Sequence, residues 1–224
     1  MLHDRTQILI GEPGLACLAA ARVTAVGLGG VGGGAVEALA RAGVGQLCLI
    51  DGDVVTESNL NRQILYTYND IGKPKAIIAA NRIKQITPAC ITQAHHIFLN
   101  EENIPRLIQN TDFVLDCIDS LAAKESLIMH CISNSINIVS SMGAGNRLDP
   151  LRFNITDISK THTDPLAREM RRRLRQHKIA HLPVVFSEEQ PQQAGKQIGS
   201  ISFVPPVAGM HMAGFAVKTL LKNN

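Results

Sequence analysis

Apolar and polar positions alternate along the chain in blocks that predict a regular succession of strands and helices. Short runs rich in Val, Ile and Leu, bounded by glycine or polar residues, indicate buried strands. These runs lie at 22–30, 46–53, 89–98, 112–119, 136–145, 152–159 and 181–187. Segments with apolar residues at helical spacing lie at 33–45, 73–88, 101–110, 120–135, 164–178 and 207–221. The alternation is typical of an α/β protein.

The connection between the first two predicted strands indicates how the sheet is built. A strand, a glycine-rich turn, a helix and a second strand follow one another between residues 22 and 53. Such a βαβ unit joins parallel strands by a right-handed crossover. We therefore predict a doubly wound, Rossmann-like, mainly parallel sheet with an antiparallel C-terminal extension after Pro150. At 224 residues, the chain is too short for two domains of typical size.

Composition supports a buried sheet and narrows the chemistry. Apolar residues make up 45% of the chain and aromatic residues only 4%, so small aliphatic side chains must fill the interior. The five cysteines include no CxxC pair, which excludes a zinc ribbon and a thioredoxin-like redox motif. The chain starts without a signal-peptide pattern, and no apolar run reaches the length of a membrane span. We therefore expect a cytoplasmic protein without a membrane span.

Positive charge is concentrated in one predicted helix, although the net charge of the chain is only +3. The basic residues of this cluster are Arg168, Arg171, Arg172, Arg173, Arg175 and Lys178. Glu169 is the only acidic residue among them. The cluster is either a solvated helix face or a surface that binds a polyanion.

The segment VTAVGLGGVGGG at 23–34 contains a GxGxxG spacing at Gly27, Gly29 and Gly32. Glycines let the backbone turn tightly and approach a phosphate, and the start of the following helix directs N–H groups at the negative charge. Asp51 ends the next strand about 20 residues later, where a carboxylate can accept hydrogen bonds from ribose hydroxyls. This pattern suits any nucleotide and leaves NAD open. The remaining alternative is a tight turn that binds nothing.

A polar connection after the second strand favours ATP over a nicotinamide cofactor. It contains Asp53, Asn59 and Arg62 and is followed by Lys75. A hydride-transfer site has little use for these residues. An Arg and a Lys can instead neutralise the charge that develops when an oxygen attacks phosphorus and pyrophosphate leaves. Asp119 follows another strand of the same sheet, where a carboxylate can hold Mg²⁺ against the phosphates.

Each of these residues also has a structural alternative. Arg62 and Lys75 could be surface charges, and Asn59 could hold a turn. Asp119 could cap a helix that begins at Ser120. Their joint position at strand ends of one sheet, beside a phosphate loop, favours the nucleotide interpretation.

Four motifs, in this order and spacing, resemble the ThiF-type adenylating enzymes, which are related to ubiquitin-activating enzymes. The motifs are GLGGVGGGAVEALARAGVG, LIDGDVVTESNLNRQ, GKPKA and VLDCIDS. The resemblance runs from about residue 5 to about residue 220 and implies one ThiF-like adenylation domain over 1–224. Within it, 1–150 would be the nucleotide-binding core, and 151–224 a substrate-side extension with a closing helix. It also implies ATP as the nucleotide and Mg²⁺ as its metal.

The same resemblance implies roles for individual residues. The cofactor-binding residues would be Gly27, Gly29, Gly30, Gly32, Asp51, Asp53 and Asn59. The catalytic residues would be Arg62, Lys75, Asp119 and Arg5, with Asp119 as the magnesium ligand. Family members are usually homodimers in which an N-terminal arginine of one subunit reaches the ATP site of the other. Arg5 would be that arginine.

The second half of the chain resembles one branch of the family, the tRNA threonylcarbamoyladenosine dehydratases. The matching segments lie at 140–175, 184–191 and 199–209. The branch implies that ATP activates the carboxylate of N6-threonylcarbamoyladenosine in tRNA as an acyl-adenylate. Intramolecular attack then closes a cyclic product with loss of water. The partner of the basic cluster would be tRNA, bound through phosphate contacts that weaken with salt.

Other functions remain open at this point. The chain could activate the C-terminal glycine of a ubiquitin-like sulfur-carrier protein, which would add a sulfur-transfer partner. It could also be an NAD-dependent oxidoreductase or a non-catalytic scaffold. Relatives that activate sulfur carriers usually have zinc CxxC pairs or a late reactive Cys, whereas this chain has no Cys after Cys131. Branch members often have a Cys just before VFS, where this chain has HLPVVFS, so sulfur chemistry is excluded there. Cyclisation of an acyl-adenylate needs no enzyme thiol, which favours the tRNA reaction.

Overall fold

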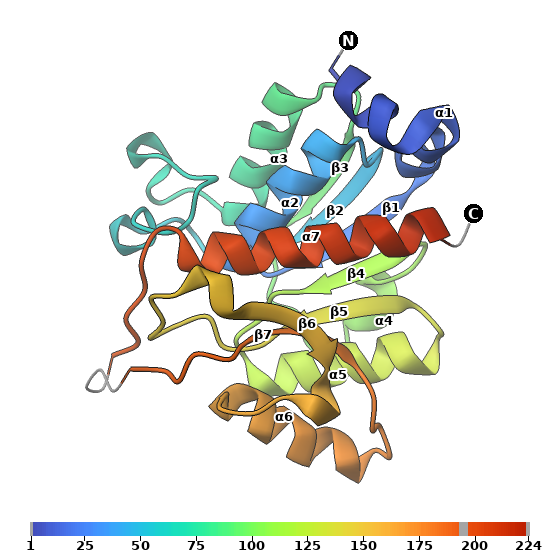
Figure 1. The fold of residues 1–224 in the computed structure, drawn as a ribbon. Helices are drawn as coiled ribbons and strands as arrows, with labels where there is room; N and C mark the ends of the chain where they lie inside the picture. The colour runs from blue at the N-terminus through green and yellow to red at the C-terminus, as the bar shows by residue number, and fades with distance from the viewer. Residues whose placement is uncertain (1, 193–196, 223–224) are drawn as a thin grey trace.

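Seven strands form one central sheet with helices on both faces in the computed structural model, which describes residues 2–192 and 197–222 (Figure 1). The strands are β1 (Arg22–Val26), β2 (Gln46–Ile50), β3 (Ile91–His95), β4 (Phe113–Asp116), β5 (Asn137–Ser141), β6 (Phe153–Asp157) and β7 (Pro183–Ser187). The helices are α1 (Asp4–Ala20), α2 (Gly30–Ala42), α3 (Lys75–Ile86), α4 (Ile104–Leu107), α5 (Leu121–Ser133), α6 (Pro165–Gln176) and α7 (Val204–Lys222). The predicted order of elements is therefore confirmed from residue 22 onward.

The strand order is β3-β2-β1-β4-β5-β7-β6. Neighbouring strands are parallel except β6 and β7, which pair antiparallel. The predicted doubly wound sheet and its antiparallel extension are confirmed. The chain builds outward from β1 to β3 and then returns to place β4 on the other side of β1. Ligands of such sheets bind at the carboxyl ends of the strands, where the order reverses.

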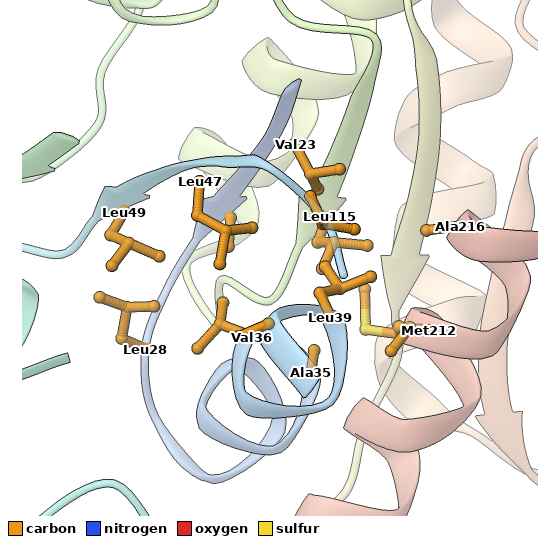
Figure 2. Packing of buried hydrophobic residues seen from close by; sticks show 14 of the residues in the cluster. Val23, Leu28, Ala35, Val36, Leu39, Leu47, Leu49, Leu115, Met212 and Ala216 are labelled. Atoms are coloured by element: carbon orange, nitrogen blue, oxygen red, sulfur yellow. The ribbon is translucent and has the colours of Figure 1, made fainter. Parts of the chain in front are cut away.

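Two apolar layers fix the helices to the sheet. On one face, Val36 and Leu39 of α2 pack against Leu47 of β2, and Met212 of α7 lies on the other side of α2 (Figure 2). On the opposite face, α4, α5 and α6 pack their apolar side chains against the sheet in a second cluster. Burial of each of these aliphatic side chains contributes about 1.5–3 kcal/mol to the free energy of folding. The loops at the strand ends therefore start from a rigid frame.

Helix α1 has no counterpart among the predicted elements. Gly11, with a φ of 72°, and Pro13 interrupt it, so the sequence lacks a continuous helical pattern there. Its apolar residues Ile8 and Leu9 are 82% and 85% exposed, so they do not mark a buried face. Near its end, Leu18 is buried, and the helix contacts α7.

The closing helix α7 crosses the sheet beside α2 (Figure 1). It begins three residues earlier than predicted, with Pro205 and Pro206 in its first turn. The side chain of Pro205 packs against Gly30 at the start of α2. Within residues 2–192 and 197–222, no helix combines the length and the apolar character needed to cross a membrane.

Candidate active site

A cavity of about 970 Å³ opens at the carboxyl ends of the parallel strands. One wall, which we call the nucleotide side, comprises residues from the glycine loop at 27–31, the polar connection at 51–75 and the turn at 117–120. The opposite wall, which we call the far wall, comprises residues from the loop at 143–147, the start of α6 at 164–166 and the segment at 198–200. The cavity has the position expected for the ligand site of a doubly wound sheet.

The glycine loop presents the start of α2 to the cavity. Gly27 has a φ of +87°, and a Cβ on it would lie 2.6 Å from the Cys117 carbonyl oxygen. A Cβ on Gly32 would overlap the carbonyl oxygen of Gly27. Only glycine fits either position. Gly29, at the N-cap of α2, has no side chain to cap the helix, so the first N–H groups are left for an anion.

Asp51 ends β2 and is tied to the glycine loop. Its Oδ2 accepts a hydrogen bond from the Leu28 N–H at 2.6 Å, and its Oδ1 accepts one from the Asp53 N–H at 2.8 Å. Burial raises the pKa of the Asp51 carboxyl, although these N–H groups and the charge of Lys75 oppose the shift. Each carboxylate oxygen has a second lone pair with which to accept a bond from a ligand.

Lys75 is the first residue of α3, and its side chain is only 7% exposed. Its Nζ lies 3.0 Å from the carboxylate of Asp53, which is 54% exposed. The surface-charge alternative for Lys75 is therefore wrong. A counter-ion that stays largely in water is one that a bound phosphate could replace.

Arg62 and Asn59 belong to the turn around the short 3-10 helix η1 (Glu57–Asn59), and both line the cavity. Arg62 Nη1 donates hydrogen bonds to two oxygens of neighbouring residues at 2.8 and 2.9 Å. These contacts hold the half-buried guanidinium without neutralising its charge. Asn59 Oδ1 accepts a hydrogen bond from the Thr56 N–H at 3.1 Å, so the turn-holding role of Asn59 is confirmed.

Asp119 lies exposed in the turn after β4, at the edge of the cavity. Its carboxylate forms no hydrogen bond with the described residues, so the structure does not show it capping α5. In the described part of the chain, no three His, Cys, Asp or Glu side chains are grouped to hold a metal ion. A cation at this place would take Asp119 as a protein ligand and other oxygens from phosphates and water.

A fully buried ion pair supports the turn that carries Asp119. Lys124 Nζ lies 2.8 Å from Asp116 Oδ2, and both side chains are 0% exposed. Nζ also donates to Ser140 Oγ at 3.1 Å and to the Ser141 carbonyl oxygen at 3.0 Å. These bonds join β4, β5 and α5 directly behind the cavity. The pair was not identified from sequence because each residue lies in a segment whose dominant signal is apolar.

The far wall contains a second buried ion pair that sequence analysis missed. Arg147 Nη2 lies 3.0 Å from Asp164 Oδ2, with side chains 1% and 0% exposed. Asp164 Oδ2 also accepts a hydrogen bond from the Gly143 N–H at 3.0 Å, and its Oδ1 caps α6 through the Ala167 N–H at 3.1 Å. The Asp-Pro step before a helical pattern could have identified this cap. Nothing local in the sequence connects it to Arg147.

An apolar surface borders the nucleotide side. Its members are Ile97, Phe98, Leu99 and Ile118. Phe98 is 67% exposed, and its ring lies against Gly52, next to Asp51. Flat aromatic and aliphatic surfaces of this kind suit a nucleobase. These residues were not identified as site residues from the sequence, because an apolar side chain within or beside a strand is typical of the core.

The basic cluster lies on α6 except for Lys178, which follows the end of the helix at Gln176, and half of the cluster is engaged within the molecule. Arg171 donates to the Thr161 carbonyl oxygen at 2.9 Å. Glu169 pairs with Arg172 at 2.6 Å and with Arg173 at 3.1 Å. The cluster residues that are exposed and have no partner among the described residues are Arg168, Arg175 and Lys178. These three are the better candidates for an external anion.

Arg5 lies away from the cavity of its own chain. It is exposed on α1, which leads directly into β1 and so lies toward the amino ends of the strands (Figure 1). A single chain therefore does not bring Arg5 to the site. Its role across a dimer stays a prediction.

The five cysteines are all free. Burial raises the pKa of Cys48 and Cys90 to about 11, and that of Cys131 to about 12, so these thiols stay protonated at neutral pH. Cys117 lines the cavity, but burial raises its pKa further, and its Sγ lies 3.7 Å from the Met212 sulfur. These four cysteines offer no ready nucleophile.

Comparison with known proteins extends these observations. The ThiF family model matches residues 3–224. A tRNA threonylcarbamoyladenosine dehydratase of Bacillus subtilis is 40% identical over 245 residues, covering 100% of this chain and 96% of that protein. The crystal structure of the E. coli enzyme TcdA in complex with ATP has a TM-score of 0.93 at 36% identity, and that with AMP a TM-score of 0.92 at 35% identity. Each covers 98% of this chain and 93% of the solved chain. The chain belongs to the ThiF family, as its glycine loop and the three motifs that follow it predict.

Proposed function

We propose that this protein uses ATP to dehydrate N6-threonylcarbamoyladenosine in tRNA through an acyl-adenylate. One observation carries the proposal: an uncapped helix start, Lys75, Arg62 and Asp119 line a single cavity. The relative that is 40% identical over the full chain bears the name of this activity. The similar solved structures hold ATP and AMP, the nucleotides that enter and leave an adenylation.

Each part of ATP has a complementary surface on the nucleotide side. The apolar surface around Phe98 would bind the adenine. Asp51, fixed by two backbone N–H groups, would accept hydrogen bonds from the ribose hydroxyls. The phosphates would lie over the glycine loop, where the first N–H groups of α2 offer hydrogen bonds and a positive dipole.

Arg62 and Lys75 would stabilise the adenylation step. An oxygen of the substrate carboxylate attacks the α-phosphorus, the bond to the bridging oxygen breaks, and pyrophosphate leaves with the electron pair. Two cations beside the phosphates neutralise the charge that develops, and preorganised groups of this kind are each worth about 10²–10³ in rate. Asp119 would hold Mg²⁺, which would offset the negative charge of the phosphates when bound.

Ring closure would need no covalent enzyme intermediate. An atom of the carbamoyl group attacks the activated acyl carbon and the carbamoyl group releases an N–H proton, while the bond from the acyl carbon to the AMP oxygen breaks and AMP leaves with the former carboxylate oxygen and the electron pair. The nucleoside thereby loses one water. The Cys117 thiol would not take the acyl group, because burial raises its pKa and keeps it protonated.

The remaining parts of the proposal concern partners. Arg168, Arg175 and Lys178 would bind tRNA phosphates. A homodimer would bring Arg5 of one subunit to the ATP site of the other. The magnesium ion, the homodimer and a cytoplasmic location stay predictions, and a sulfur-transfer partner has no role in this scheme.

Pyrophosphate exchange combined with mass analysis tests the proposal. With ATP, Mg²⁺ and tRNA carrying threonylcarbamoyladenosine, labelled pyrophosphate should enter ATP and the nucleoside should lose the mass of one water. The matched control is the same tRNA with unmodified adenosine, which should support neither change. Exchange stimulated by a ubiquitin-like sulfur carrier, and not by modified tRNA, would establish the adenylyltransferase alternative. Tight NADH binding without ATP binding would establish the oxidoreductase.

A further inference from the structure

Several buried polar atoms without a partner lie in residues that line the cavity. In the part of the chain that the structure describes, Gln63 Oε1, Arg147 Nε and Ser200 Oγ are buried and form no hydrogen bond. Buried polar groups in folded proteins are nearly always paired, so each unpaired one calls for an explanation. Two of these three atoms, those of Arg147 and Ser200, belong to the far wall.

The far wall is held in shape by bonds that leave these two atoms free. The Asn146 N–H donates to the Gly199 carbonyl oxygen at 2.8 Å, and the Gly199 N–H donates to Asn146 Oδ1 at 2.6 Å. These two hydrogen bonds join the loop before Arg147 to the segment before Ser200. Arg147 is held by Asp164 through Nη2, so its Nε–H remains as a fixed donor.

The far wall begins where the phosphate-binding residues end. Asn61, the neighbour of Arg62, donates to the Ser200 carbonyl oxygen at 3.0 Å. A substrate group that contacts Ser200 would therefore lie close to the phosphate that we expect Arg62 to contact. The acyl group of an acyl-adenylate would extend from the α-phosphate along the far wall.

The charge of the far wall indicates what kind of group it binds. Asp164 neutralises Arg147, and both side chains are fully desolvated. A neutralised guanidinium whose buried Nε–H has no partner suits an uncharged acceptor oxygen better than a carboxylate. A serine hydroxyl can donate or accept, so it suits another hydroxyl.

We propose that the far wall is the subsite for the threonylcarbamoyl group, with Arg147 Nε–H donating to the carbamoyl oxygen and Ser200 Oγ pairing with the threonine hydroxyl. This inference rests on the proposed function. It assigns substrate specificity to residues that lie outside the nucleotide motifs.

Kinetics with two tRNA substrates test the subsite. One tRNA carries threonylcarbamoyladenosine, and the other carries the analogue built on 2-aminobutyrate, which lacks only the threonine hydroxyl. The wild-type protein should prefer the threonyl substrate roughly tenfold in kcat/KM, and Ser200→Ala should reduce that preference to less than about threefold. Ser202→Ala is the matched control, since Ser202 is exposed nearby and should keep the wild-type preference.

Arg147→Lys tests the second contact. Lysine keeps a charge for Asp164 but lacks the Nε–H, so kcat/KM for both tRNAs should fall at least tenfold while the Kd of ATP stays within about twofold. Should this variant fail to fold in thermal unfolding, Ser200→Ala still decides the proposal. Unchanged substrate preference in Ser200→Ala, or ATP affinity lost together with tRNA turnover, would overturn the subsite alone. A wild-type protein inactive on modified tRNA would overturn both the subsite and the proposed function.

Discussion

The two walls of the cavity are built in different ways. The nucleotide side comes mostly from one continuous stretch, in which the glycine loop, Asp51 and Lys75 follow one another along the chain at spacings that one βαβ unit sets. The far wall joins segments around residues 146, 164 and 199, which are distant in sequence. On the nucleotide side, Lys75 pairs with the exposed Asp53, and Arg62 pairs with no carboxylate. On the far wall, the buried Asp164 neutralises Arg147. The difference favours binding of phosphates by charged side chains on the nucleotide side. On the far wall it favours binding of an uncharged acyl group by oriented hydrogen bonds.

Breaking the buried pair that joins the walls should have the largest effect. Lys124 contacts Asp116 behind the nucleotide side and the Ser141 carbonyl oxygen where the far wall begins. Lys124→Met leaves Asp116 as an unpaired buried charge, and should lower the free energy of unfolding by about 3–5 kcal/mol. Urea denaturation measures the change. Lys84→Met, at an exposed position of α3, should change stability by less than about 0.5 kcal/mol. Equal effects of the two variants would contradict the account.

Removing Lys75, the phosphate contact that we propose, should affect chemistry and spare the fold. Lys75→Ala leaves only the exposed Asp53 without a partner, so stability should change little. Pyrophosphate exchange should fall about 10²–10³-fold, because a positive group beside the leaving phosphates is lost. Lys73→Ala is the matched control, since the Lys73 side chain is 55% exposed and its Nζ forms only a long ion pair, at 3.8 Å, with Asp70. A similar loss of exchange in both variants would mean that Lys75 has no specific role.

The exposed part of the basic cluster should matter for tRNA and not for ATP. The double variant Arg175→Ala/Lys178→Ala should weaken tRNA binding several-fold and reduce the slope of log K against log salt by roughly 1–2. Binding titrations at several salt concentrations measure this, with the Kd of ATP as an internal control. Lys84→Ala removes a positive charge elsewhere and should leave the slope unchanged. An unchanged slope in the double variant would place tRNA on another surface.

The smallest expected effect concerns acidity. Burial raises the pKa of the Asp51 carboxyl, so ATP affinity should fall on acidification with an apparent pKa above the ordinary value of about 3.9. A carboxyl whose pKa is raised on folding holds its proton more tightly in the folded state. Its contribution to stability therefore increases as pH falls, and loss of ATP binding should precede any unfolding. Titrations of ATP binding and unfolding between about pH 7 and pH 4 check this. Affinity lost only together with the fold would contradict it.

Sequence alone selected many of the residues that line the nucleotide side of the cavity, because their spacing is local. Gly27 and Gly32 meet backbone restrictions within one loop, and Asp51 follows them at a spacing set by one βαβ unit. The same local logic gave every strand of the sheet and the helices after residue 22. It missed α1, which a glycine and a proline interrupt and whose apolar residues Ile8 and Leu9 stay exposed.

The far wall could not be predicted because its partners meet only through the fold. Arg147 and Asp164 are separated by β6 and the turns around it, and neither stands in a motif. For the basic cluster, the sequence shows the positive charge but not the contacts of the side chains. Only the structure shows that Arg171 and Arg173 already bind other residues of the protein. Local spacing identifies residues that line one cavity when they belong to one loop and the segments that follow it.

Isotope transfer tests the central claim that the cavity activates a carboxylate as an adenylate. Modified tRNA whose threonine carboxylate carries ¹⁸O is incubated with ATP and the protein, and the AMP and nucleoside are analysed by mass. We expect AMP to gain one ¹⁸O for each nucleoside that loses a water. Cyclised nucleoside formed without ¹⁸O in AMP, or with the label in inorganic phosphate, would contradict it.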